Sequence, residues 1–225
     1  MPVMCLRYAF TTTNFKLIKE RFDLENITHE IKPRYNISPT QNVPVIFNDR
    51  KSSLSEAKWG LSAHWLEKTR AEHFLFNARA ESIDKKPSFK KDFETRRCLM
   101  IADSFYEWKH PEKRPFKVAL KSDEMFAFAG IYAQEGDART CCMITTESNE
   151  LVSKVHNRMP VILQNGIEQE WLGMGAEEAK ESLRPYPSEK MHMYELTSRI
   201  NSSKIDSPDV IELKTAKGTL AEFMR

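Results

Sequence analysis

Short apolar runs, each bounded by charged or turn-forming residues, recur along the chain and predict a protein built mainly from β-strands. The clearest is Cys98–Ala102, which leads directly into Asp103–Lys109. Runs of this length that end in charge are typical of buried strands. Further strands are expected near residues 1–10, 43–47, 74–81, 117–120, 125–132, 140–146, 157–163 and 191–196. We expect residues 98–108 and the three strands between 117 and 146 to form one antiparallel meander.

Helical spacing of apolar residues is confined to short segments, at 15–22, 88–97, 148–156, 168–172 and 176–183. The segment Lys32–Gln41 carries prolines at both ends, so it cannot form a regular helix or a central strand and is expected to be an extended loop. Residues 197–225 are polar and irregular, and no repeat or linker divides the chain. We therefore expect an α+β fold: a single compact domain over residues 1–225, with a mainly antiparallel sheet or barrel-like core and peripheral short helices.

The composition is that of a globular protein and narrows the classes of function. Of 225 residues, 40% are hydrophobic and 29% charged, and the net charge is only +2. A general polyanion-binding surface is therefore not implied, whereas a local basic cleft stays open as an interpretation. No apolar run approaches the roughly 20 residues that span a bilayer. The N-terminus does not resemble a signal peptide, so we expect a cytosolic location without membrane contact.

The four cysteines indicate neither a metal site nor a disulfide framework. Cys5, Cys98, Cys141 and Cys142 show no Cys-x-x-Cys spacing, and no histidine follows at a metal-finger interval. No metal and no other cofactor is expected. The last three lie in apolar stretches and are interpreted as small core residues, whereas Cys5 stands apart because it lies near the terminus.

Glu107 is the first candidate for chemistry. It lies between Tyr106 and Trp108 at the end of the strand that begins at Cys98. Poor solvation beside aromatic rings disfavours the ionised carboxylate and raises its pKa, which is a property of catalytic acids and bases. The alternative is a solvated surface glutamate, and the residue alone does not decide between the two.

Other polar or aromatic residues allow both a structural and a functional interpretation. Trp59 and Trp65 are either core packing or a platform on which a base can stack. Arg79 either pairs with Glu81 on a wet sheet face or reaches a bulky anion. His156 is either structural or an acid–base group near neutral pH.

Five motifs together resemble a known family. They are Pro33–Gln41, Trp59–Leu61, Asn77–Glu81, Phe105–Lys109 and His156–Val161. Their order and spacing are similar to those of the SRAP family, the SOS-response-associated-peptidase-like proteins that shield abasic sites in single-stranded DNA. The resemblance runs from Cys5 to about Val210, nearly the whole chain.

The resemblance implies a covalent mechanism that begins at an N-terminal cysteine. In the family, the α-amine and the thiol of that cysteine attack the aldehyde of an abasic site and close a thiazolidine. An α-amine has an unperturbed pKa near 8, so much of it is nucleophilic near neutrality. Here Cys5 matches the nucleophile, Asn77 would position it and the sugar, and Glu107 and His156 would transfer protons, with their division of labour open.

The same resemblance implies a single-stranded DNA partner, a monomeric protein and a bacterial cytosolic or nucleoid-associated location. Arg79 and Arg158 would hold phosphates as bidentate donors, and Arg7 would do the same. The cleft for the strand and its bases would be lined by Asn36, Trp59 and Trp65.

The chain departs from the family pattern most seriously at its N-terminus. Met1–Met4 precede Cys5, and an amide nitrogen cannot form the imine, so these residues must be lost before crosslinking. Met4 as the translational start, followed by removal of that methionine, is favoured over self-cleavage. Smaller departures are Leu6 in place of glycine, Ser62-Ala63 in place of Ile-Pro, and Ser104 in place of glycine.

Three functions therefore stay open. The leading one is lyase-like crosslinking of abasic sites. The second is a cysteine-type autopeptidase, or N-terminal nucleophile hydrolase, that acts on its own leader through Cys5, Glu107 and His156. The third is a noncovalent binder of single-stranded DNA in which Cys5 has no role.

Overall fold

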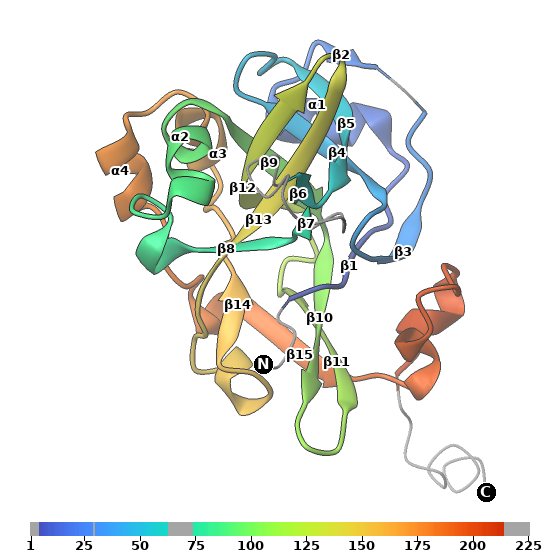
Figure 1. Ribbon diagram of the computed structural model, residues 1–225. Helices are drawn as coiled ribbons and strands as arrows, with labels where there is room; N and C mark the ends of the chain where they lie inside the picture. Colours follow the sequence, from blue (N-terminus) through green and yellow to red (C-terminus); the bar gives the residue numbers. More distant parts are fainter. Residues whose placement is uncertain (1–4, 29, 63–73, 214–225) are drawn as a thin grey trace, which may run out of the picture.

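A closed barrel of five strands forms the centre of the computed structural model, which describes residues 5–28, 30–62 and 74–213 (Figure 1). Antiparallel pairing joins neighbouring strands around most of the ring, and β13 closes it by pairing in parallel with β5. In ring order the strands are β5 (Ser53–Trp59), β4 (Asn42–Phe47), β9 (Arg97–Ala102), β12 (Phe126–Glu135) and β13 (Ala138–Glu147). Three short strands extend this sheet: β2 (Asn26–Ile27), β8 (Asn77–Arg79) and β14 (Arg158–Pro160).

A second sheet of five strands carries the N-terminal part of the described chain. Its order is β15 (Met191–Glu195), β11 (Arg114–Leu120), β10 (Ser104–Lys109), β1 (Tyr8–Phe10) and β3 (Arg34–Ile37). The hairpin of β10 and β11 projects at the bottom of Figure 1. A further pair, β6 (Leu61–Ser62) and β7 (Phe74–Leu75), stands beside the barrel.

The barrel interior explains the unbroken apolar run of β9. All six residues of β9 are buried, because one face lies inside the barrel and the other is covered by helices α2 and α3 and the chain around them. Trp59 and Phe47 are among the largest fully buried side chains. A strand buried on both faces loses the apolar–polar alternation, as this sequence does.

The helices are short and peripheral. They are α1 (Phe15–Phe22), α2 (Pro87–Thr95), α3 (Ile167–Trp171) and α4 (Ala176–Glu181). Asn14 caps α1, because its side chain accepts a hydrogen bond from the backbone of Leu17. Single 3-10 turns are η2 (Ala80–Ser82), η3 (Val152–Lys154), η4 (Ser188–Lys190), η5 (Ser198–Asn201) and η6 (Pro208–Ile211). The expected α+β class with a barrel-like core is thus confirmed.

Four sequence-based expectations about elements are wrong. The single meander is instead divided between two sheets, because the chain leaves the barrel after Ala102 and β10 pairs with β1 and β11. Glu107 therefore lies inside a strand and not at its end. The segment 148–156 contains one 3-10 turn, Val152–Lys154, instead of a helix capped by Ser148, and the Asn149 side chain accepts a hydrogen bond from the backbone of Val152. Part of the expected loop at 32–41 is β3, which sits at a sheet edge where prolines are tolerated.

The segment after β15 packs on the outer face of the second sheet. Ile200 and Val210 join Ala9, Tyr106 and Leu196 in a small hydrophobic cluster separate from the main core. The polar composition of this segment hid those two anchors. Among the described residues, no helix has the length and apolar character needed to cross a membrane.

Candidate active site

Cys5 and Glu107 are in direct contact. The backbone nitrogen of Cys5 donates a hydrogen bond of 3.1 Å to Oε1 of Glu107, and both residues are buried. The contact follows from the second sheet, because β1 begins three residues after Cys5 and pairs with β10, which carries Glu107. The register of two strands therefore brings a near-terminal cysteine to a carboxylate in the middle of the chain.

Burial tunes the Glu107 carboxyl to neutral pH. Loss of solvation raises its pKa to about 7, although hydrogen bonds from the Cys5 thiol and from the backbone of Cys5 and Trp108 favour the ionised form. At neutral pH the protonated and ionised forms are both populated. A carboxyl in that state can accept or deliver a proton.

The Cys5 thiol stays protonated near neutrality. Burial raises the pKa of the thiol well above its usual range, and the negative charge of Glu107 adds to the effect, while the positive charge of Arg158 opposes it. Cys5 also has a φ of 42°, a left-handed backbone conformation that is uncommon for a residue with a side chain. The residue is thus held in a defined and unfavourable geometry.

His156 presents a neutral imidazole. Burial lowers the pKa of His156 below its usual value. Nδ1 lies 3.1 Å from the backbone nitrogen and 3.3 Å from the backbone oxygen of Arg158, so its role as acceptor or donor depends on the tautomer. Nε2 is buried and has no hydrogen-bond partner among the described residues. It is therefore a candidate donor or acceptor, according to the tautomer, for a bound molecule.

The Arg158 guanidinium is held by the protein itself. Its two terminal nitrogens bind Glu81, at 2.5 and 3.0 Å, and one of them also donates to the backbone oxygen of Thr145 at 2.7 Å. This bidentate pair lowers the pKa of Glu81 despite partial burial. Arg158 is consequently a fixed cation near the Cys5 thiol. Its guanidinium already binds protein groups, whereas the motif suggested a bidentate donor open to a phosphate.

Asn77 and Arg79 lie on β8, which runs parallel to β13 with Asn77 opposite Met143 and Arg79 opposite Thr145. Because Thr145 also binds Arg158, this pairing brings the third and fifth motifs together. Arg79 is exposed and Asn77 half-buried. Of the two arginines in question, Arg79 is thus the one that solvent and a phosphate can reach.

A cavity of about 820 Å³ opens above the Cys5–Glu107 pair. Its wall includes residues that sequence reasoning did not select, namely Trp108, His110, Lys113, Asn201 and Ser203. Trp108 was within reach of that reasoning, since it adjoins Glu107 in the same motif. Asn201 and Ser203 carry no signal in the sequence, because only the fold of the last segment brings them to the cleft.

Arg7 and Asn36 are linked to each other and to the segment after β15. Arg7 Nη1 donates to Asn36 Oδ1 at 2.6 Å and to the backbone oxygen of Ile200 at 3.0 Å. Asn36 is fully buried, so the expectation that it lines the cleft is wrong. Arg7 does line the cavity.

Of the two tryptophans expected to stack on bases, the structure describes only Trp59. Trp59 is fully buried, and its indole N–H donates to the backbone oxygen of Phe76 at 2.9 Å. Its ring has no face open to a base, so the stacking role is wrong and the core-packing interpretation is correct. Trp65 lies outside the described residues, as do Met1–Met4.

Within the described part of the chain, no three His, Cys, Asp or Glu side chains come together as metal ligands. A second hollow, of about 380 Å³, lies beside α1 and includes Asp103 and Lys117. It is separate from Cys5 and contains none of the residues that the motifs selected.

Fold, motif order and the Cys5–Glu107 contact together define a small barrel protein with a buried near-terminal cysteine beside a carboxyl. The sequence model described as SOS response associated peptidase (SRAP) matches residues 4–203. The chain therefore belongs to the SRAP family.

Relatives and a solved structure agree with this assignment. The chain is 39% identical to the Abasic site processing protein YoqW of Bacillus subtilis, over 93% of this chain and 99% of the relative. It is 36% identical to YoaM of the same organism, also called an abasic site processing protein, over 93% and 98% of the two chains. The crystal structure of a protein from Bacteroides thetaiotaomicron shares the fold, with a TM-score of 0.80, 24% identity and coverage of 94% and 100%.

Proposed function

We propose that this protein processes abasic sites in single-stranded DNA by forming a covalent adduct through Cys5. The observation that carries the proposal is the 3.1 Å contact between the Cys5 nitrogen and Glu107, whose pKa is about 7. The names of the relatives support the substrate class. The family match begins at Met4, directly before Cys5, which supports a mature chain that starts at the cysteine.

The reaction needs a free α-amine at Cys5. The amine adds to the aldehyde carbon of the ring-opened abasic sugar, and loss of one water gives an imine. The thiol sulfur then adds to the imine carbon and its proton passes to the nitrogen, so that a thiazolidine forms with no other change in atoms. Glu107 accepts the proton that the ammonium form must lose and returns one to the departing hydroxyl. Amine and thiol belong to one residue, so ring closure has a high effective molarity.

His156 is assigned the proton that opens the sugar ring. In the tautomer in which Nδ1 accepts from the Arg158 N–H, the ring proton is on Nε2, and that atom is buried without a partner among the described residues. A donor in this state can protonate the ring oxygen of the sugar while the aldehyde forms. Asn77 is assigned to hold the sugar, and Arg79 to bind a flanking phosphate.

A second candidate is cleavage of the peptide bond before Cys5. The Cys5 thiol would add to the preceding carbonyl, and the nitrogen at 3.1 Å from Glu107 would leave as an amine that Glu107 protonates. Water would then hydrolyse the thioester, which releases Met1–Met4 as a free acid and restores the Cys5 thiol. The left-handed φ of Cys5 favours this idea, because strain at the bond is relieved when it breaks.

A denaturing gel tests the leading proposal. The chain that begins at Cys5 is incubated with single-stranded DNA that contains an abasic site. We expect a shifted band, none with Cys5→Ala, and none with a chain that retains Met1–Met4. A shifted band with Cys5→Ala contradicts the covalent mechanism.

Intact mass tests the second candidate. If Glu107→Gln retains Met1–Met4 while the native sequence loses them, the protein cleaves itself. If both lose them, ordinary N-terminal processing or an alternative translational start is responsible. If Cys5→Ala protects abasic sites as well as the native protein does, the function is noncovalent binding of single strands. A monomeric state and a bacterial cytosolic or nucleoid-associated location stay predictions.

A further inference from the structure

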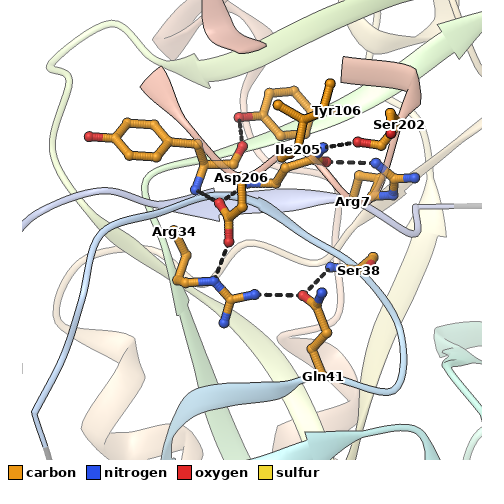
Figure 2. Close-up of polar contacts among 10 residues, drawn as sticks. Arg7, Arg34, Ser38, Gln41, Tyr106, Ser202, Ile205 and Asp206 are labelled. Carbon is orange, nitrogen blue, oxygen red and sulfur yellow. Dashed lines mark hydrogen bonds and ion pairs between the residues drawn. The ribbon is translucent and has the colours of Figure 1, made fainter. Parts of the chain in front are cut away.

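Asp206 does not line the cavity above Cys5. Two series of hydrogen bonds begin at its carboxylate and lead to residues that do line it (Figure 2). It follows the family match, which ends at residue 203. We call Ser198–Ile211 the C-terminal strap. This segment runs across the outer face of the second sheet, from η5, which contacts β11, to η6, which contacts the edge strand β3.

The Asp206 carboxylate binds the strap to β3. Oδ1 accepts from the backbone nitrogens of Tyr35 and Asn36, at 2.5 and 3.0 Å, and Oδ2 accepts from Nε of Arg34 at 2.5 Å. Two of these donors are N–H groups of an edge strand, which otherwise lack a strand partner on that side. The Asp206 side chain is 27% exposed, so the contact is shielded in part from solvent.

The first hydrogen-bond chain runs through Asn36 to Arg7. The Asn36 amide nitrogen donates to the backbone oxygens of Ser202 and Ile205, at 2.9 and 2.8 Å. Carbonyl oxygens can only accept, so they fix the NH₂ group toward the strap and turn Oδ1 toward Arg7. Arg7 also donates to Ile200 of the strap and lines the cavity above Cys5. The docked strap therefore sets the orientation of this cation.

The second chain runs through Arg34 to Ser38. Nη2 of Arg34 donates to Oε1 of Gln41 at 2.6 Å, and that same oxygen accepts from the backbone of Ser38 at 3.1 Å. Ser38 lines the same cavity. Both chains thus begin at one carboxylate and end in the wall of the cleft.

The strap also contributes to the wall directly. Asn201 and Ser203 line the cavity with Cys5 and Glu107, and Asn201 accepts a hydrogen bond of 2.7 Å from the indole N–H of Trp108. Lys113 faces the same space from the β10–β11 turn. Hydroxyl, amide and cationic groups on one wall suit the sugar and phosphate of a nucleic acid strand.

We propose that Asp206 is a positioning residue for DNA binding, which docks the C-terminal strap on β3 and so fixes Arg7, Ser38, Asn201 and Ser203 as the wall that contacts the nucleotide beside the abasic site. This inference rests on the proposed function for its choice of ligand. Asp206 touches neither Cys5 nor Glu107 and has no role in the bond-forming steps.

Binding and chemistry are measured separately to test it. Binding uses a fluorescent single-stranded oligonucleotide with a tetrahydrofuran abasic analogue, which has no aldehyde and cannot be crosslinked. Chemistry is the rate of adduct formation at saturating DNA that contains a true abasic site. For Asp206→Ala we expect a Kd about tenfold higher, a saturated rate within about twofold of the native value, and faster amide exchange at Tyr35 and Asn36.

Two matched variants accompany Asp206→Ala. Asp206→Asn keeps an oxygen for the two backbone donors but loses the charge that binds Arg34. Its Kd should therefore lie between that of the native protein and that of Asp206→Ala. Asp49→Ala removes a carboxylate that binds Arg139 through both oxygens, on the barrel, and should leave Kd unchanged.

Faster exchange at Tyr35 and Asn36 with a native Kd overturns the proposal, because the strap would then be released without consequence for DNA. The proposal is also overturned if Asp206→Ala lowers the saturated rate of adduct formation by the same factor as it lowers affinity. If Asp206→Ala fails to fold, Ser203→Glu replaces it, since Ser203 is exposed and takes no part in docking. We expect Ser203→Glu to weaken binding at least tenfold, and native affinity overturns the proposal. If the native protein binds the analogue but forms no adduct, the covalent function fails while the role of Asp206 is still decided by Kd.

Discussion

The backbone nitrogen of Cys5 and the carboxylate of Glu107 lie 3.1 Å apart, although 102 residues separate them in the chain. Pairing of β1 with β10 creates this contact, and burial of both residues gives the carboxyl a pKa of about 7. Strand register and desolvation together thus place beside the Cys5 nitrogen a carboxyl that can accept or deliver a proton near neutral pH.

The first prediction concerns catalysis by Glu107. Glu107→Gln keeps an oxygen that can accept the Cys5 N–H but cannot carry a proton. We expect the rate of adduct formation to fall about 100-fold, in the range typical of general acid–base catalysis. The native rate should rise with pH as Glu107 and the Cys5 ammonium lose their protons, and the contribution of Glu107 should disappear in the variant. Single-turnover assays between pH 5.5 and 8.5 compare the two profiles, and an identical pH profile in Glu107→Gln assigns the rise to the amine alone.

The second prediction concerns stability and follows from the same pKa. Glu107 has a folded-state pKa above its unfolded value, so between about 4.5 and 7 the unfolded chain releases its proton first. Stability therefore falls as pH rises through that window, by about 3 kcal/mol at 1.4 kcal/mol per pKa unit. Glu107→Gln should be more stable than the native protein at pH 8 and equal to it near pH 4. Urea denaturation at both values measures the difference, and equal stability at pH 8 contradicts the raised pKa.

Much of the barrel could be predicted from the sequence, because apolar runs such as that of β9 are local signals. The site could be predicted only through its motifs. Glu107 was selected from its aromatic neighbours, but its contact with Cys5 depends on sheet register, which local patterns do not encode. Asn36 was assigned to DNA through the family resemblance, in a segment expected to be an extended loop. Its burial under the strap depends on contacts with residues 164 to 169 positions away.

The third prediction separates the two arginines of the motifs. Arg79 is exposed, whereas Arg158 binds Glu81 and the backbone of Thr145. Arg79→Ala should weaken DNA binding and leave the melting temperature unchanged. The slope of the logarithm of the binding constant against the logarithm of the salt concentration should fall by about one, the value for one phosphate contact. Arg158→Ala should lower the melting temperature, because buried acceptors lose their donor. Lys90→Ala, on the exposed face of α2, removes the same charge away from the cleft and serves as the control.

The fourth prediction tests the proton donor. His156→Ala should slow adduct formation about 100-fold with a sugar that must be opened. A small aldehyde that needs no ring opening should react with Cys5 at nearly the native rate. Competition assays with both substrates distinguish this role from a structural one, in which both reactions would slow together. Because burial lowers the pKa of His156, no titration step from this ring is expected above pH 6.5.

The fifth prediction concerns Trp59, which the motif had suggested as a stacking platform. Its ring is fully buried and its N–H is bound to Phe76, so it belongs to the core. Trp59→Ala should destabilise the fold by about 3–5 kcal/mol, as large core truncations do. Trp59→Phe retains most of the packing, should fold, and should bind single-stranded DNA with native affinity once the protein is below its melting temperature. If the folded Trp59→Phe protein loses more than tenfold in affinity, the stacking role is restored. A change of core packing at this position is not expected to alter the cleft.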